Sequence, residues 1–210
     1  MASLWASRSE AAEGPPVPAS DHVEAVQARA WIKRGALTIA PVASYAFNDP
    51  FLIRGGGGLR AVYWIRSLVG FSLDVSGWAQ TPSEDARIAQ RELRAQIEPT
   101  GSSWAALMGA EIAPVDGKIA VLSSIVPFEL FLRLGAGPAS STDAVTSAPA
   151  LALSAGLGAR WYLQGHFGLD TSLTWRSASI TRSLNGLPVD ARDTVVSFDV
   201  GIPFRFGGGP

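Results

Sequence analysis

Charged side chains recur at alternate positions of several otherwise uncharged segments, and their types point to ion pairing. Nearly all of the positive charges are arginines, because lysine occurs only at Lys33 and Lys118. Arginine forms directed, two-point ion pairs with carboxylates, which suits paired charges in a tight interior. The charged residues predicted to share one polar face and form such a network are Arg54, Arg60, Asp74, Glu111, Glu129, Arg133, Arg160, Asp170, Arg176, Asp199 and Arg205.

The sequence predicts no other chemistry. Neither of the two histidines, His22 and His166, is accompanied by a base–nucleophile pair or by metal-ligand spacing. There is no cysteine, which excludes a thiol nucleophile, a thiolate metal site and a disulfide. The glycines Gly55–Gly58 lack the following helix and lysine of a phosphate-binding loop. We therefore expect no catalytic residue, no metal site and no cofactor, and we do not expect an enzyme.

The charged residues lie in segments whose polarity alternates with a period of two, as in a β-strand with one apolar face. The last segment, Thr194–Phe206, is the clearest example. Its apolar residues are Val196, Phe198, Val200, Ile202, Phe204 and Phe206. With seven earlier segments of the same kind, the predicted strands are residues 35–47, 51–65, 69–79, 104–112, 119–138, 151–162, 167–176 and 194–206.

The connections between these segments are predicted to alternate between short and long. The short turns are near residue 66, at Val115–Lys118 and at Gln164–His166, and the long loops are Thr81–Gly101, Ala139–Ala148 and Ser177–Asp193. A capping sequence predicts a helix at Asp85–Ile97 within the first long loop, and a β-bulge is expected near Ser123-Ser124. The connection Asn48–Pro50 is short where a long one is expected. An even strand number with alternating short and long connections is typical of transmembrane barrels.

Alternation alone does not say which face of the strands lies inside the barrel. In a soluble, lipocalin-like barrel the apolar face points inward, whereas in a membrane barrel it faces lipid. Only 17% of the residues are charged and 47% are hydrophobic, and soluble surfaces usually carry more lysine and glutamate. Aromatic residues also gather at strand ends, as interfacial girdles do: Tyr45, Phe47, Phe51, Tyr63, Trp104, Trp161, Trp175, Phe204 and Phe206. The predicted fold is therefore an all-β, eight-stranded antiparallel up-and-down transmembrane β-barrel with a short helix in one long loop.

Residues 1–34 are predicted to be a flexible N-terminal lead-in, residues 35–206 the barrel and residues 207–210 a tail. Met1–Gly14 lacks the apolar core of a signal peptide, although Ser9–Gly14 looks like the small-residue end of a cleavage region. Two interpretations stay open. The segment is a signal-peptide remnant followed by a periplasmic segment, with the true start upstream of Met1, or it is a disordered cytosolic tail.

The end of the chain resembles the C-terminal signal by which bacterial outer-membrane barrels are recognised for insertion. The resemblance lies in the stretch DVGIPFRF, with Asp199, Gly201, Phe204 and Phe206 at the matching positions. It implies that the barrel-insertion machinery is a partner. The glycines and the proline that follow Phe206 depart from the signal.

A wider resemblance rests on the order of ALTIAPVASYAFNDPF, GGGLRAVYWI, FELFLRLGAGP, LGARWYLQGHFGLDTSL and FDVGIPFRF. Together these stretches resemble the outer-membrane β-barrel domain family of myxobacteria and relatives, which are small OmpA- or OmpX-like barrels. The resemblance implies the outer membrane of a Gram-negative bacterium, outer-membrane lipid as a partner and, in some members, a link to envelope machines. It carries over no catalytic residue.

Three functions are consistent with these observations. The first is a structural or scaffolding outer-membrane barrel whose lumen is filled by the Arg/Asp/Glu network and which binds envelope proteins through Thr81–Gly101 or the lead-in. The second is a narrow, porin-like channel or small-solute transporter, and the third is a soluble ligand-binding barrel. A net charge of −1 gives no sign of nucleic-acid binding.

Overall fold

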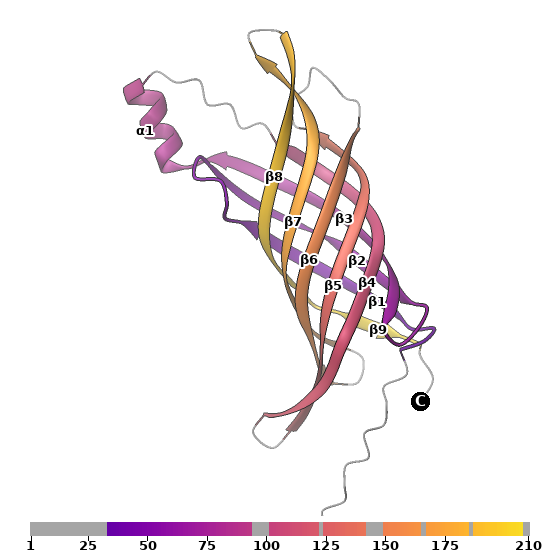
Figure 1. Cartoon of the computed structure of the whole chain (residues 1–210). Coiled ribbons are helices and arrows are strands. Elements are labelled where there is room, and N and C mark those ends of the chain that lie inside the picture. The colour runs from indigo at the N-terminus through magenta and orange to yellow at the C-terminus, as the bar shows by residue number, and fades with distance from the viewer. Residues whose placement is uncertain are drawn as a thin grey trace, which may run out of the picture. The chain divides into compact units, whose positions relative to one another are not determined.

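The described residues form antiparallel strands that pair in chain order and close into one barrel (Figure 1). The elements are β1 (Leu37–Ala46), β2 (Leu52–Trp64), β3 (Val69–Pro82), α1 (Glu84–Leu93), β4 (Ser102–Val121), β5 (Ser124–Ser141), β6 (Ala150–Gln164), β7 (Phe167–Leu184), β8 (Leu187–Gly201) and β9 (Phe204–Phe206). Strand β1 closes the barrel by pairing with β2 on one side and with β8 and then β9 on the other. Because β8 and β9 are two parts of one last strand, the predicted eight-stranded antiparallel barrel is confirmed.

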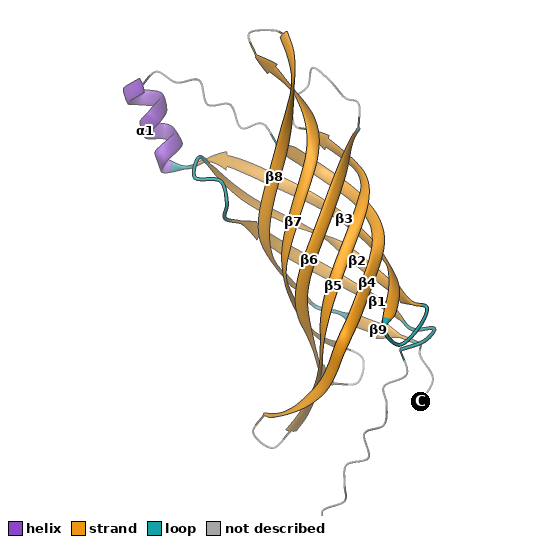
Figure 2. Cartoon of the chain, viewed as in Figure 1, coloured by secondary structure: helices purple, strands orange, loops and turns teal. Residues whose placement is uncertain are grey.

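This computed structural model describes residues 33–93, 101–121, 124–141, 149–164, 167–184 and 187–207. The chain divides into two units, Met1–Ala30 and Trp31–Pro210, and the barrel belongs to the second. The predictions for residues 1–32 and 208–210, and both histidines, lie outside the described residues. Figure 2 shows that the described residues are almost all strand, with one helix in a connection. Among them, no helix has the length and hydrophobicity that crossing a bilayer requires.

The last strand is interrupted at Ile202 and Pro203, because proline has no N–H to donate to the strand ladder. Backbone bonds nevertheless hold the interruption in place. The Ile202 N–H donates to the Pro41 carbonyl at 3.1 Å, and the Pro203 carbonyl accepts from the Gly168 N–H at 3.0 Å. The strand then resumes and ends beside the start of β1, where Phe206 pairs with Leu37.

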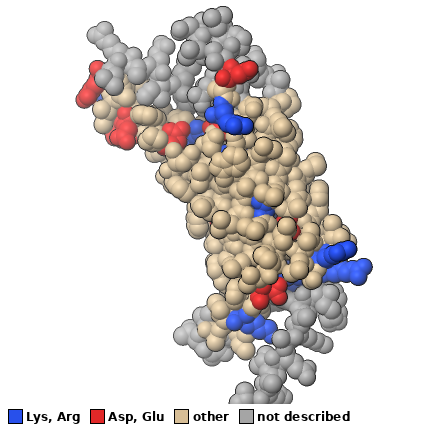
Figure 3. Space-filling model, viewed as in Figure 1, with Lys and Arg blue, Asp and Glu red and all other residues tan. Residues whose placement is uncertain are grey.

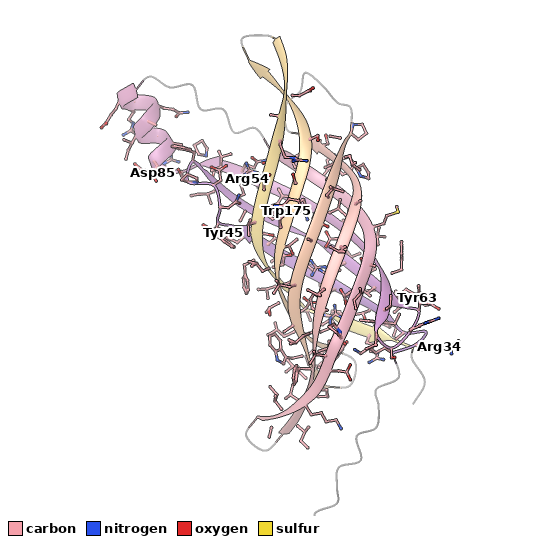
Figure 4. All side chains as sticks on the ribbon, in the orientation of Figure 1. Arg34, Tyr45, Arg54, Tyr63, Asp85 and Trp175 are labelled. Atoms are coloured by element: carbon pink, nitrogen blue, oxygen red, sulfur yellow. The ribbon has the colours of Figure 1, made fainter. Side chains whose placement is uncertain are left out.

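The apolar faces of the strands lie on the outside of the barrel. In β3, Phe71, Leu73 and Val75 are 49%, 41% and 46% exposed, whereas Ser72 and Ser76 on the opposite parity are buried. The same alternation runs round the barrel, and Tyr45 and Tyr63 lie toward opposite ends of this apolar zone (Figure 4). The lipocalin-like alternative needs the apolar face inside and is therefore wrong.

On the face drawn in Figure 3, charged side chains gather toward the two ends of the barrel. Between them lies a broad uncharged zone, interrupted by one small charged spot. An apolar band bounded by polar ends is the surface that a bilayer requires of a barrel.

The hairpin of β4 and β5 is longer than the sequence suggested, and the turn predicted at Val115–Lys118 is wrong. Val115 pairs with Leu130 and Lys118 with Pro127, and pairing continues to the end of the hairpin. The strands are joined by residues 122–123, so the bulge predicted near Ser123-Ser124 falls at this connection. The β4–β5 pairing has two register shifts, one between Ser102 and Trp104 and one between Ile112 and Val115. The second lies beside Pro114, which cannot donate a ladder bond.

The connection Ser177–Asp193 is also different from the prediction, because most of it is strand rather than loop. Strand β7 continues to Leu184, and β8 starts at Leu187. Part of this hairpin extends beyond the apolar zone, where a strand needs no apolar outer face and shows no alternation to read. The predicted helix in Thr81–Gly101 is present as α1, and the Ser83 hydroxyl caps it by accepting from the Ala86 N–H at 3.2 Å.

The barrel has a terminal end and a loop end. The terminal end holds the start of β1 and the end of β9, together with the β2–β3, β4–β5 and β6–β7 connections. The loop end holds the remaining connections, including α1.

Candidate functional site: the barrel interior

A fully buried arginine, Arg160 on β6, lies at the centre of the barrel's charged interior. Its Nη1 lies 3.0 Å from Glu111 Oε1 and 2.6 Å from Glu129 Oε1, and its Nη2 lies 2.9 Å from Asp170 Oδ2. Glu129 and Asp170 are its register partners on β5 and β7. Strand pairing therefore places three carboxylates from three strands around one guanidinium.

The ion pairs continue from this centre in two directions. Arg133 donates to Glu111 Oε2 through Nε at 3.0 Å and Nη2 at 2.5 Å. On the other side, Arg60 reaches Asp170 at 3.6 Å. Arg60 also donates to Asp74 at 3.1 Å and to Asp199 at 3.2 Å. The result is a connected set of charges held by facing strands.

Hydroxyl groups satisfy the remaining acceptor capacity of Asp199. Thr174 donates to Asp199 Oδ2 at 2.7 Å, and Ser197 donates to Asp199 Oδ1 at 2.9 Å. Charge-assisted bonds of this kind compensate for the loss of water around a buried carboxylate.

The other predicted network residues contact different partners in the interior. Arg176 lies 3.8 Å from Asp74, and its guanidinium lies over the Trp78 ring at 5.3 Å. The guanidinium of Arg205 lies over the Tyr162 ring at 6.0 Å. Arg54, labelled in Figure 4, forms a separate group toward the loop end. All the predicted network residues take the inward parity, and all are buried except Asp74, which is partly exposed.

Two charged residues of the interior are absent from the predicted network. Asp193 accepts from Arg54 at 2.7 Å and from the Ser102 N–H at 2.9 Å, although the sequence places it at the end of a loop. Lys33 lies 2.5 Å from Glu129 and over the Trp64 ring at 5.0 Å. The rarity of lysine in the sequence is the one signal that could have drawn attention to Lys33.

The interior also contains an apolar cluster that the sequence analysis did not predict. The Phe131 ring lies close to two guanidinium groups, 4.8 Å from that of Arg133 and 4.9 Å from that of Arg160. It packs with Ala36, Val62, Trp64 and Ala113. Cation–π attraction of this kind is stronger where water is excluded. Phe131 and the ion pairs together fill the section of the lumen around Arg160.

A small cavity lies toward the loop end, with Arg54, Trp78, Arg176 and Asp193 among its lining residues. Its volume is about 10 Å³, which corresponds to about one water molecule. Within the described ranges, no three His, Cys, Asp or Glu side chains gather so as to hold a metal ion. The geometry therefore supports charge pairing and lumen filling.

The residues of the C-terminal resemblance divide between the two faces. Asp199 belongs to the interior network. Gly201 lies against β1, where an added Cβ would be 3.0 Å from the Pro41 carbonyl oxygen. Phe204 and Phe206 are exposed on the outer face at the terminal end.

No protein-family model matches the sequence, and no curated protein matches it either. Solved structures do match. OprG of Pseudomonas aeruginosa, an outer membrane protein, is 14% identical over 83% of this chain and 97% of that chain, with a TM-score of 0.54. Ail of Yersinia pestis is 17% identical over 82% of this chain and 99% of that chain, with a TM-score of 0.40. A de novo designed transmembrane β-barrel is 14% identical over 82% and 97%, with a TM-score of 0.42. By its likeness to OprG, this chain has the fold of an outer-membrane β-barrel.

Proposed function

We propose that the protein is a structural or scaffolding β-barrel of the bacterial outer membrane whose lumen is filled by ion pairs. The observation that carries this proposal is the burial of Arg160 among Glu111, Glu129 and Asp170, none of which is more than 1% exposed. An eight-stranded barrel is just wide enough for its own side chains. A lumen of that width, filled by ion pairs around Arg160, leaves the outer face and the connections as the surfaces that can act.

The outer-membrane location is supported by the exposed apolar zone and by the fold. A closed barrel satisfies every backbone group without water, as a membrane-spanning structure must. Lipid of the outer membrane is then the partner of the outer face. Exposed Phe204 and Phe206 at the terminal end support recognition of the last strand by the barrel-insertion machinery. Membership of the myxobacterial outer-membrane barrel family is part of the proposal and rests on the five sequence stretches given above.

Envelope proteins are proposed to bind at Thr81–Gly101 or at the N-terminal lead-in. In the first of these, the charged side chains of α1 are exposed, and Arg87 meets Glu84 only at 3.7 Å. Exposed ion pairs of this kind contribute little to stability, which leaves the charges available to a partner. Connections on a rigid scaffold are where binding usually resides.

Single-channel recording in planar bilayers tests the filled lumen. The purified protein should show no steady openings, because a passing ion would have to displace buried charge pairs. An Arg54→Ala variant, altered outside the Arg160 group, should be equally silent. Steady, ion-selective openings of the unaltered protein would instead establish the alternative function, a narrow channel or small-solute transporter.

A further inference from the structure

Two neighbouring grooves cross the outer face of β4 to β8, at right angles to the strands. Their volumes are about 400 Å³ and about 470 Å³, and both are bordered by Leu134, Ala155 and Trp175. Trp175 is labelled in Figure 4. Strand register explains the direction of the grooves, because Ala110 pairs with Leu134, Leu134 with Ala155, and Ala155 with Trp175. These four outward side chains form a row, which we call the dividing row, and one groove lies on each side of it.

Small residues make the outer face hollow at this place. The dividing row alternates small and large side chains, so that Ala110 and Ala155 open gaps beside Leu134 and Trp175. On the inner face, a Cβ at Gly109 would collide with the Leu134 carbonyl oxygen, and one at Gly158 would collide with Phe131. Glycine at position 109 thus lets the β4 and β5 backbones approach each other closely, and glycine at position 158 lets β6 lie close to Phe131 in the lumen.

The chemistry of the grooves is that of hydrocarbon. The first is lined on its outer edges by aliphatic side chains such as Ile112, Leu132 and Leu157. Arg133 is its one charged lining residue, and this side chain is 6% exposed because it faces inward to Glu111. A groove of this kind inside the lipid-facing zone is filled by hydrocarbon or by protein, since water gains no hydrogen bonds there.

We propose that these grooves bind an acyl chain of a membrane phospholipid, an inference that rests on the outer-membrane location proposed above. The occupant follows from shape. Leu134 is 62% exposed and stands between the two grooves, so a second, convex barrel wall meets this ridge before it can fill either recess. A flexible acyl chain is thin enough to lie in one groove and pass beside Ala155 into the other. Exposed Lys118 on β4, at the terminal end, offers a positive charge to a phospholipid phosphate.

The test uses the full-length protein in phosphatidylethanolamine–phosphatidylglycerol vesicles that contain a phospholipid with a photoactivatable diazirine in one acyl chain. After irradiation, labelled peptides are located by mass spectrometry. Labelling should concentrate on β4 to β7 around Leu134 and Ala155, and it should be weak on β1 and β2. Uniform labelling round the barrel would overturn the proposal, because it would show only the general lipid contact of the outer face.

Matched variants make the test independent of labelling efficiency. The double variant Ala110→Leu/Ala155→Leu fills the gaps of the dividing row, whereas Ala43→Leu/Ala61→Leu adds the same atoms to the outer face of β1 and β2. If each leucine at the groove displaces about one methylene of the chain, labelling there should fall about tenfold. The control pair should leave it unchanged, and equal effects of the two pairs would contradict the proposal.

Other occupants give different results in the same vesicles. Disulfide trapping of two copies through Ala155→Cys would show a protein interface and overturn the proposal. Labelling by a diazirine lipopolysaccharide in place of the phospholipid would overturn the assigned source. A protein that is not heat-modifiable on a gel and is labelled nowhere would instead mean that the proposed membrane location is wrong.

Discussion

At the scale of single residues, the interior contains buried charges that are stable only when they are paired with opposite charges. The single guanidinium of Arg160 contacts three carboxylates, those of Glu111, Glu129 and Asp170. Moving a charge out of water is costly, and close opposite charges must offset that cost. A buried network of this kind makes each member sensitive to the loss of another.

Replacing Arg160 with methionine should therefore destabilise the barrel strongly. It leaves three buried carboxylates short of a partner, and breaking a buried pair costs roughly 3–5 kcal/mol. Urea unfolding of the purified protein in detergent micelles, followed by the loss of heat modifiability, measures the change. Arg66→Met is the control, because Arg66 is exposed in the β2–β3 turn and should change the free energy of unfolding by less than about 0.5 kcal/mol. Similar values for the two variants would show that the network is dispensable.

On the outer face, by contrast, apolar side chains are required and a charged side chain is destabilising. Leu173 on β7 is 41% exposed and lies in the middle of the apolar zone. Leu173→Arg should cost about 2–4 kcal/mol, the depth-dependent cost of arginine near the midplane. Ser179→Arg, on the outward parity of the same strand but farther toward the loop end, should cost at most about 1 kcal/mol. Unfolding in lipid vesicles compares them, and a larger loss at Ser179 would mean that the apolar zone is misplaced.

The sequence could identify interior residues only where both strand and register were readable. Glu129 and Arg133 lie on the polar side of a clear alternation, so their inward position could be predicted. Asp193 could not, because its segment has no apolar outer face from which to read a parity. Lys33 lies before the first strand, and only the closed barrel places its ammonium beside Glu129.

At the scale of elements, alternation predicts a strand only where its two faces meet different surroundings. That holds for β1 to β3, whose outer residues meet lipid and whose inner residues meet the lumen. Beyond the apolar zone both faces of a hairpin meet water, and the contrast disappears. The sequence analysis missed the ends of β4, β5, β7 and β8 for this reason. Val115–Lys118 contains turn-forming residues, but it is strand, and its Lys118 pairs with Pro127.

The far part of the β4–β5 hairpin should be dispensable for folding. Strand β4 pairs with β3 only as far as Ile112, and β5 pairs with β6 only from Phe128. Among the described residues, those from 118 to 127 thus have strand partners only within the hairpin. Replacing residues 118–127 with Asn-Gly, a favoured two-residue turn, should change the free energy of unfolding by less than about 1 kcal/mol.

Heat modifiability and urea unfolding check this shortened hairpin. The comparison variant is Glu129→Ala, which keeps the hairpin but removes a carboxylate that Lys33 and Arg160 share. It should lose far more stability than the shortened form. A shortened protein that fails to fold, beside a stable Glu129→Ala variant, would assign the hairpin a role in closing the barrel.

At the scale of the whole molecule, closure is a property that no local segment contains. Successive register partners run from Leu37 through Tyr63, Phe71, Ala110, Leu134, Ala155 and Trp175 to Val196. The next backbone bond, from the Phe47 N–H to the Val196 carbonyl, returns to the residue just after β1 and not to Leu37. This stagger sets strand tilt and barrel width. The strand number was predictable from periodicity, but the stagger depends on all pairings at once.

Closure also fixes which charged sites share a side of the membrane. Arg87 and Arg91 on α1 are exposed at the loop end, and Arg66 and Lys118 are exposed at the terminal end. In outer-membrane barrels the short turns face the periplasm and the longer loops face the cell exterior. Trypsin added to intact cells should therefore cut at Arg87 or Arg91 and leave Arg66 and Lys118 uncut. Strand arginines such as Arg160 should resist throughout, because they are buried in a closed sheet.

The matched measurement opens the outer membrane before the protease is added. Cleavage at Lys118 should then appear, while the cuts at Arg87 and Arg91 should be unchanged, and mass spectrometry of the fragments distinguishes these sites. An Arg87→Gln/Arg91→Gln variant should lose the cuts in intact cells and keep the one at Lys118 in opened cells. If Lys118 is cut in intact cells while α1 is shielded, the barrel is inserted the other way round. The proposed binding of envelope partners through Thr81–Gly101 would then have to be placed in the periplasm, because the loop end would face inward.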